Sequence, residues 1–283
     1  MTINQEEQAA KPTRLSNAQR ALLEKRLQNL RKLPAQEIQR RPAGAKIPLS
    51  FAQQRLWFLD QLETGKPIYN ITAASRMVGE LSYQALDQSM TAILGRHEIL
   101  RTTFTVVADE PVQHIQPLAN FRFTAVPYTT ADHPGKPDNQ LIDLRHLPAA
   151  EREMAARHLT TAEMHRPFNL ATGPLLRASL FQLEATEHIL ILTIHHIVSD
   201  GWSMGIFFHE LGAFYDGFVH GRSPSLSPLP IQYGDFVYWQ QQELSGEKLE
   251  QQLGYWRQQL DSAATLLELP TDRPRPVVQR FQG

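Results

Sequence analysis

Apolar residues recur along this chain at two spacings, one typical of helices and the other of strands. The two spacings predict a mixed order of elements, and we therefore expect an α/β domain built in layers. The last two strands are expected to pair as a hairpin across residues 184–187. Helices are predicted over 52–62, 83–94, 148–164, 202–219, 232–244 and 247–260, and strands over 69–78, 100–107, 112–115, 174–183 and 188–195.

The segment before Ile47 has a different character from the rest. Residues 11–46 hold ten Lys or Arg and two Glu, and apolar residues recur at helical spacing between Leu15 and Leu30. Ser16 and Gln19 fit a capping box at the start of that helix. Two interpretations stay open for residues 1–46: a solvated linker helix, or a basic helix that docks on an upstream partner.

The C-terminal residues of the sequence are predicted to form a connector. Pro270, Pro274 and Pro276 exclude a helix there, so residues 269–283 are interpreted as the start of an extended linker. The predicted domain boundaries are therefore 1–46, 47–268 and 269–283.

Composition excludes several classes of protein. The net charge of −1 gives no electrostatic footprint for nucleic acid. The chain has no cysteine, which removes disulfides, thiolate metal sites and a cysteine nucleophile. No apolar run approaches the roughly 20 residues that span a bilayer, and the polar N-terminus has no signal core. We expect a cytoplasmic protein with no membrane or nucleic-acid partner.

The densest polar cluster follows the most apolar predicted strand. Residues 189–194 are almost continuously apolar, which predicts a strand buried on both faces, and His195 and His196 come next. Side chains alternate across a strand, so the two histidines should point in opposite directions. Asp200 and Gly201 follow in a turn into the next helix, a place where α/β folds put ligands and catalytic groups.

Each of these residues also has a purely structural interpretation. A lone histidine is more often a core residue, Ser199 or Asp200 could cap the next helix, and Gly201 could relieve backbone strain. The absence of Cys partners and of a second His at ligand spacing argues against zinc, and we expect no metal. The combination of all these residues in one turn favours a functional site.

Four ordered motifs resemble those of nonribosomal peptide synthetase condensation domains. The third is similar to the HHxxxDG signature of that family, and the resemblance extends from about Ile47 to the end. The motifs are Ser50–Leu59 (SFAQQRLWFL), Arg96–Phe104 (RHEILRTTF), Ile194–Ser203 (IHHIVSDGWS) and Tyr233–Trp239 (YGDFVYW).

The resemblance implies a fold and a set of roles. The fold would be a chloramphenicol-acetyltransferase-like two-layer α/β sandwich, of which this chain holds the first lobe of a two-lobed V. His196 would act at the chemistry. Independently of the resemblance, the Gly201 N–H is a candidate oxyanion donor, because glycine lets another group approach closely. His195 would be structural, and Asp200 would pair with Arg96 beside the site. The tryptophans of the motifs, Trp57, Trp202 and Trp239, are interpreted as core.

The same resemblance implies an acyltransferase that joins two carrier-bound units through an amide bond. The substrates would arrive on the phosphopantetheine arms of upstream and downstream peptidyl carrier domains, with an adenylation domain in the same synthetase. The domain itself would bind no cofactor. Trp202 favours the elongating type with an L-configured donor. We expect the chain to be inactive without a second lobe.

Other functions compete with this one. A heterocyclising relative would have aspartates in place of His195 and His196, and an epimerising relative would follow a carrier domain rather than a short tether. A starter-type N-acyltransferase with a lipid donor, a free-standing acyltransferase and a non-enzymatic recruiting domain stay open.

Overall fold

The structure is a computed structural model that describes residues 37–119, 121–126, 128, 137–222, 226–264 and 269–274. Residues 39–283 form one compact unit, separate from residues 1–38. The predicted basic helix before Leu30 lies outside the described residues. In the part that is described, no helix is long and apolar enough to cross a membrane.

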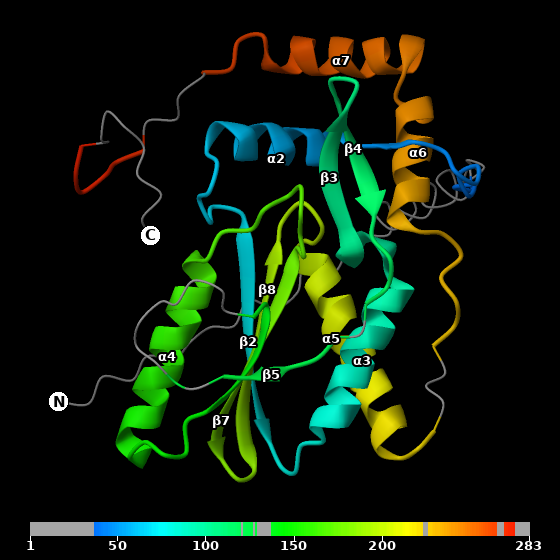
Figure 1. The fold of residues 1–283 in the computed structure, drawn as a ribbon. Helices are drawn as coiled ribbons and strands as arrows, with labels where there is room; N and C mark the ends of the chain where they lie inside the picture. The colour runs from blue at the N-terminus through cyan, green and yellow to red at the C-terminus, as the bar shows by residue number, and fades with distance from the viewer. Residues whose placement is uncertain are drawn as a thin grey trace, which may run out of the picture. The chain divides into compact units, whose positions relative to one another are not determined.

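The centre of the unit is a five-stranded sheet in the order β2, β8, β7, β6, β5 (Figure 1). The strands are β2 (Asn70–Val78), β8 (Glu187–His195), β7 (Leu176–Glu184), β6 (Asn139–Asp143) and β5 (Thr124–Ala125). Pairing is antiparallel from β2 to β7 and parallel from β7 to β5. β7 and β8 form the predicted hairpin, and β8 lies between β2 and β7.

Helices cover both faces of this sheet. On one face, α3 (Tyr83–Arg96) and α5 (Gly201–Val219) pack over a core that includes Leu180, Leu190 and Leu192. On the other face, α4 (Ala149–His165) packs over the alternate strand residues, among them Phe181 and Ile191. Figure 1 shows α4 on one side of the strands and α3 and α5 on the other. The predicted α/β class is confirmed, with one layer more than a two-layer sandwich.

A second, smaller sheet has the order β1, β4, β3. Its strands are β1 (Ile47–Pro48), β4 (Glu110–Ile115) and β3 (Thr102–Val107), and the 3-10 helix η1 (Glu98–Arg101) precedes β3. Ala108 and Asp109 form the turn between β3 and β4, both with positive φ (52° and 63°), which is the backbone of a tight hairpin turn. Strand β4 begins at Glu110, two residues before the predicted start at residue 112.

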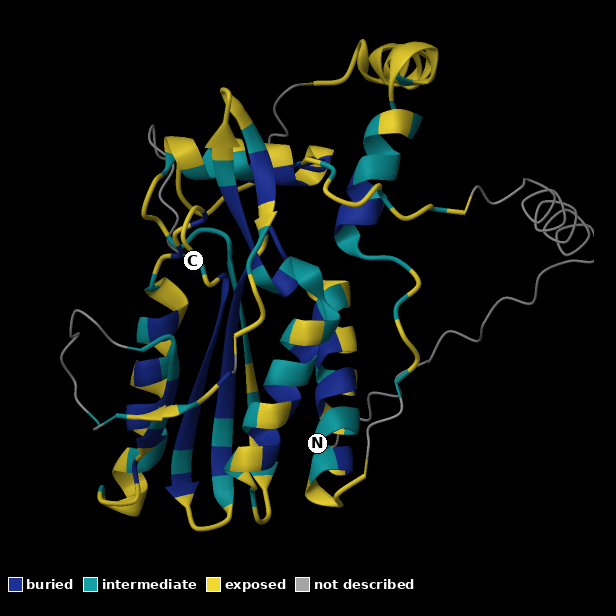
Figure 2. Cartoon of the chain, turned by 45° about the vertical axis from the view of Figure 1, so that its right-hand side comes forward, coloured by how far each residue is buried: buried dark blue, intermediate teal, exposed yellow. Residues whose placement is uncertain are grey.

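Three further helices complete the unit: α2 (Phe51–Leu62), α6 (Tyr233–Glu243) and α7 (Gly246–Leu260). Ser50 begins α2 with a capping box to Gln53, which satisfies donors at the helix start. Tyr233 on α6 meets that cap, because its hydroxyl lies 3.0 Å from the Ser50 hydroxyl. α7 buries no residue and presents an exposed surface along almost its whole length (Figure 2).

The compact unit begins earlier than the predicted boundary at Ile47. Arg41 places its guanidinium between two acidic residues, 2.7 Å from Asp235 on α6 and 2.9 Å from Glu98 on η1. A Cβ atom at Gly234 would lie 2.9 Å from that guanidinium, so glycine gives Arg41 its room. Residues from about 39 onward therefore belong to the folded unit rather than to a tether.

Candidate active site

The end of β8 delivers the two adjacent histidines. The His195 N–H donates to the Leu175 carbonyl at 3.0 Å, and the His196 N–H donates to the Tyr69 carbonyl at 2.8 Å. The strand ends at His195, but these two hydrogen bonds continue to fix the backbone as far as His196. His195 is buried and His196 is exposed, as the predicted alternation requires.

His196 is held in one orientation by its own turn. Its Nδ1 lies 2.8 Å from the carbonyl oxygen of Ser199. A carbonyl oxygen only accepts, so Nδ1 must donate and carries the proton. In the neutral ring the Nε2 atom then has a free lone pair, and it can accept a proton from a substrate.

His195 has a different environment, inside the fold. Its side chain is 4% exposed, and its Nδ1 accepts a hydrogen bond from the Ile197 N–H at 3.1 Å. The rings of Tyr69 and Phe168 contact it edge-on, with centroids 6.2 and 6.1 Å away. Burial, with the nearby His196 charge as a smaller cause, lowers the pKa of His195 to about 4.

The buried, neutral His195 predicts a loss of stability in acid. In the unfolded chain His195 takes up a proton as the pH falls through about 6.5, whereas in the folded chain it does so only near pH 4. The contribution of His195 to the free energy of unfolding is therefore fully present above the unfolded pKa. It is lost as the pH drops from about 6.5 to about 4, which lowers the free energy of unfolding by about 3 kcal/mol. Urea unfolding of the wild type and of His195→Asn across this range measures the difference. Parallel curves for the two proteins would contradict it.

Asp200 and Gly201 begin helix α5 directly behind the histidines. Asp200 is the N-cap, and its Oδ1 accepts from the Ser203 hydroxyl at 2.6 Å and the Ser203 N–H at 2.8 Å. These bonds hold the pKa of Asp200 below its ordinary value. Gly201 is the first helical residue, and a Cβ atom there would meet nothing within 4 Å. Its N–H belongs to the first turn, whose donors have no partner within the helix.

The predicted pair between Arg96 and Asp200 is wrong. Arg96 instead pairs with Glu210 on α5, Nε to Oε1 at 2.9 Å, and His97 shares the same carboxylate at 2.6 Å. Glu210 is buried and needs such partners, whereas exposed Asp200 is satisfied as a helix cap. Arg96 therefore links α3 to α5.

The tryptophans also differ from one another. Trp57 packs against the core, and half-buried Trp239 lies beside Phe236 at 5.9 Å between ring centroids. Trp202 was predicted in the core, but it is 82% exposed in the first turn of α5. The prediction failed because an apolar residue type does not reveal which face of a helix it occupies. A large exposed aromatic ring therefore stands next to Gly201.

A buried ion pair supports His195 and was not predicted. Arg177 on β7 and Glu163 on α4 approach to 2.5 Å, with side chains 3% and 7% exposed. The Arg177 guanidinium lies 3.7 Å from the centre of the Phe168 ring, which in turn contacts His195. A lone arginine within the apolar run of residues 175–181 was the signal available in the sequence.

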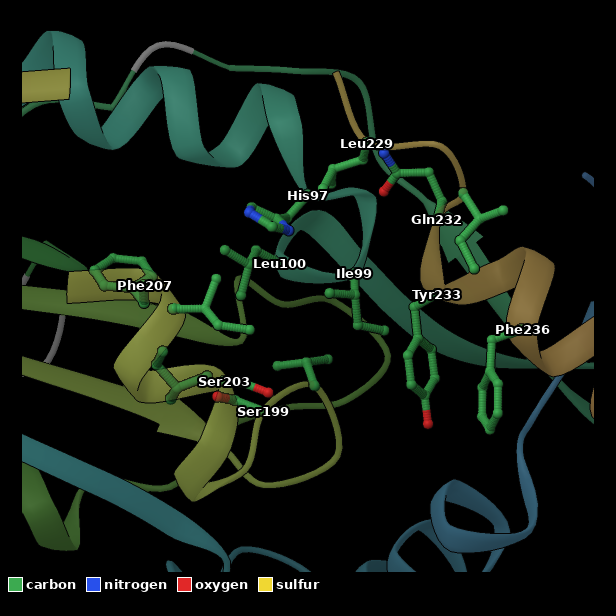
Figure 3. Close-up of a pocket in the computed structure, with 14 residues that line it drawn as sticks. His97, Ile99, Leu100, Ser199, Ser203, Phe207, Leu229, Gln232, Tyr233 and Phe236 are labelled. Atoms are coloured by element: carbon green, nitrogen blue, oxygen red, sulfur yellow. The ribbon is translucent and has the colours of Figure 1, made fainter. Parts of the chain in front are cut away.

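A cavity of about 310 Å³ adjoins the turn of residues 196–200, which the motif predicts to be catalytic and which is called the catalytic turn from here on. Figure 3 shows Ser199 and Ser203 on one side of it, and Tyr233 and Phe236 of α6 on the other. Among the described residues, no group of His, Asp and Glu is placed to hold a metal ion.

The family model of the condensation domain matches residues 44–283. This chain belongs to the condensation domain family. Members of the family catalyse amide bond formation in nonribosomal peptide synthetases, and the chain carries the HHxxxDG motif on the strand end and turn described above.

Related synthetases are similar over most of this chain. One of the linear gramicidin synthase proteins of Brevibacillus parabrevis is 48% identical over 86% of the chain, which covers 3% of that protein. Phosphinothricin tripeptide synthetase PhsC of Streptomyces viridochromogenes is 42% identical over 95% of the chain, which covers 24% of that protein.

Solved structures confirm the fold and its extent. The X-domain from teicoplanin biosynthesis matches with a TM-score of 0.69 at 32% identity, and the starter condensation domain of rhizomide synthetase RzmA with 0.66 at 20%. The matches cover 86% and 78% of this chain. They cover 49% of each solved chain, so this chain spans about half of a condensation domain.

Proposed function

We propose that this chain supplies the catalytic half of an amide-forming site, with His196 as the group that accepts the proton of the attacking amine. The observation that carries this role is the hydrogen bond from His196 Nδ1 to the Ser199 carbonyl, which leaves Nε2 free on an exposed imidazole. His195 is the structural histidine, because it is buried and neutral near pH 7.

The chemistry follows from this arrangement. The amine nitrogen of the acceptor attacks the thioester carbonyl of the donor, and His196 Nε2 takes the amine proton. As the C–N bond forms, charge on the carbonyl oxygen can be stabilised by the Gly201 N–H at the start of α5. The C–S bond then breaks, and the imidazolium returns the proton to the leaving thiolate.

Both reactants would be covalently held by carrier proteins. We propose that they arrive on the phosphopantetheine arms of an upstream and a downstream peptidyl carrier domain, loaded by an adenylation domain of the same cytoplasmic synthetase. Nonribosomal peptide synthetase relatives support this setting. We propose the elongating type with an L-configured donor, supported by Trp202, which stands exposed beside Gly201.

The reaction needs an enclosed site, which this half of the domain does not provide by itself. His196 lies on an exposed face, which neither excludes water nor holds two pantetheine arms in register. We expect no amide product from residues 1–283 alone with loaded donor and acceptor carriers, and product once the second half of the family's domain is added. Mass spectrometry of the acceptor carrier measures the amide product in both experiments. Turnover by the chain alone would contradict the need for a second half, and no product from the completed domain would contradict the function.

A further inference from the structure

The cavity beside the catalytic turn is walled by three separate parts of the fold. Ile99 comes from η1, and Val198 comes from the turn after β8, with Ile206 on α5. Phe236 comes from α6, and Leu229 comes from the loop before α6. Figure 3 shows side chains from these parts facing one another across the space. The cavity lies entirely within residues 97–236, so it needs no other chain to exist.

Hydrogen bonds tie these walls together. The side chain of Gln232 accepts from the Glu98 N–H at 3.1 Å and donates to the Arg96 carbonyl at 2.9 Å, which joins α6 to η1. Arg41 makes a second link between the same elements through Glu98 and Asp235. The cavity is therefore preformed, as most binding pockets for small molecules are.

Four of the five polar side chains of the lining are bonded to other residues. His97 is bound to Glu210, Gln232 to backbone of η1 and α3, Tyr233 to Ser50, and Ser203 to Asp200. These bonds satisfy four polar groups, and the rest of the lining is hydrocarbon together with the Ser199 hydroxyl. An uncharged, apolar occupant fits such a lining, because a charged one would lose its hydration without a partner.

Part of the cavity lining comes from the catalytic turn and from the start of α5. Ser199 and Ser203 line the cavity, and they are the residues that hold His196 and Asp200. The volume, at the low end of the range for ligand pockets, has room for about ten waters or one branched or aromatic side chain. Ser199 lines the cavity and its carbonyl accepts from the His196 ring, so the cavity adjoins the turn that holds His196.

We propose that this cavity binds the apolar side chain of an aminoacyl unit while its carbonyl or amine lies at His196. The inference rests on the proposed function and adds a substrate class to it: aminoacyl thioesters with an aliphatic or aromatic side chain. Ile206, which is 44% exposed at the cavity, controls the size of the group that enters.

Binding to this chain tests the proposal without any amide synthesis. The probes are hydrolysis-resistant amide analogues of leucyl-, alanyl- and hexanoyl-pantetheine, and the readout is methyl NMR of the 283-residue chain. We expect the leucyl probe to bind at least about tenfold more tightly than the alanyl probe, since each added methylene in an apolar pocket is worth about tenfold or more. The methyl shifts should centre on Ile99, Val198, Ile206 and Leu229.

Variants at the cavity sharpen the test. Ile206→Phe should weaken the leucyl probe at least about tenfold and leave the alanyl probe within about twofold. Val219→Phe is the matched control, because Val219 lies on the same helix with similar exposure (47%) but outside the cavity, and it should change neither affinity. If Ile206→Phe lowers the melting temperature, Leu229→Phe provides the second variant, with the same expected result.

Three outcomes would overturn the proposal: equal affinity for leucyl and alanyl probes, shifts away from the cavity, or binding of the hexanoyl probe alone, which would assign the cavity to a lipid donor. If the completed domain forms no amide product but the leucyl probe still binds, the result would contradict the proposed reaction and would not contradict the assignment of the cavity.

Discussion

Replacing His196 with alanine is expected to lower the rate of amide formation by the completed domain about 10²–10⁴-fold, the usual contribution of a positioned general base. The side chain is exposed, and its one hydrogen bond is to a carbonyl within its own turn. The free energy of unfolding should therefore change by about 0.5 kcal/mol or less. Single-turnover kinetics with loaded carriers measure the rate, and thermal unfolding measures the stability.

His209→Ala is the matched control for this variant. His209 is exposed on α5, the helix that begins behind the catalytic turn, and it does not line the cavity. Its replacement should leave the rate within about twofold of the wild type. Equal rates for the His196→Ala variant and the control would remove His196 from the chemistry.

The largest loss of stability is expected from Glu163→Ala. This change leaves the Arg177 guanidinium buried at 3% exposure, with its pKa already lowered by desolvation and its main carboxylate partner gone. Breaking a buried pair in this way costs about 3–5 kcal/mol in the free energy of unfolding. Because Arg177 packs on Phe168 and Phe168 on His195, the rate of the completed domain should fall as well.

Glu151→Ala is the control for this loss, since Glu151 is exposed in the first turn of the same helix, α4. It should cost about 1 kcal/mol or less, the size of a helix-dipole interaction. Chemical denaturation of the three proteins gives the comparison. A cost at Glu163 no greater than that at Glu151 would show that the buried pair contributes little.

Periodicity was enough to predict most of the elements that form the site. The apolar run of residues 189–194 required a strand buried on both faces, and alternation then separated buried His195 from exposed His196. Asp200, one of the two residues predicted as a possible cap of the next helix, is the N-cap of α5. Strands β1, β5 and β6 were missed, because β1 and β5 have two residues each and β6 (NQLID) has only two apolar residues.

Pairing across the fold was beyond the sequence pattern. Asp200 and Glu210 are both acidic residues near one histidine motif, and only the packing of α3 on α5 decides that Arg96 meets Glu210. The contact that orients His196 comes from a backbone carbonyl, which every residue has, so no residue type could signal it. The exposure of Trp202 likewise depends on which side of α5 meets the sheet.

The orientation of the His196 ring is the point on which the proposed chemistry depends, and ¹⁵N NMR of this chain measures it directly. With Nδ1 donating to the Ser199 carbonyl at 2.8 Å, the neutral imidazole should be the Nδ1–H tautomer, with an unprotonated Nε2. Spectra of the ¹⁵N-histidine-labelled chain, assigned by comparison with His196→Ala, should show this tautomer at a pH where the ring is neutral. A predominant Nε2–H tautomer would place the proton on the atom that must accept one, and would contradict the role of His196 as the base.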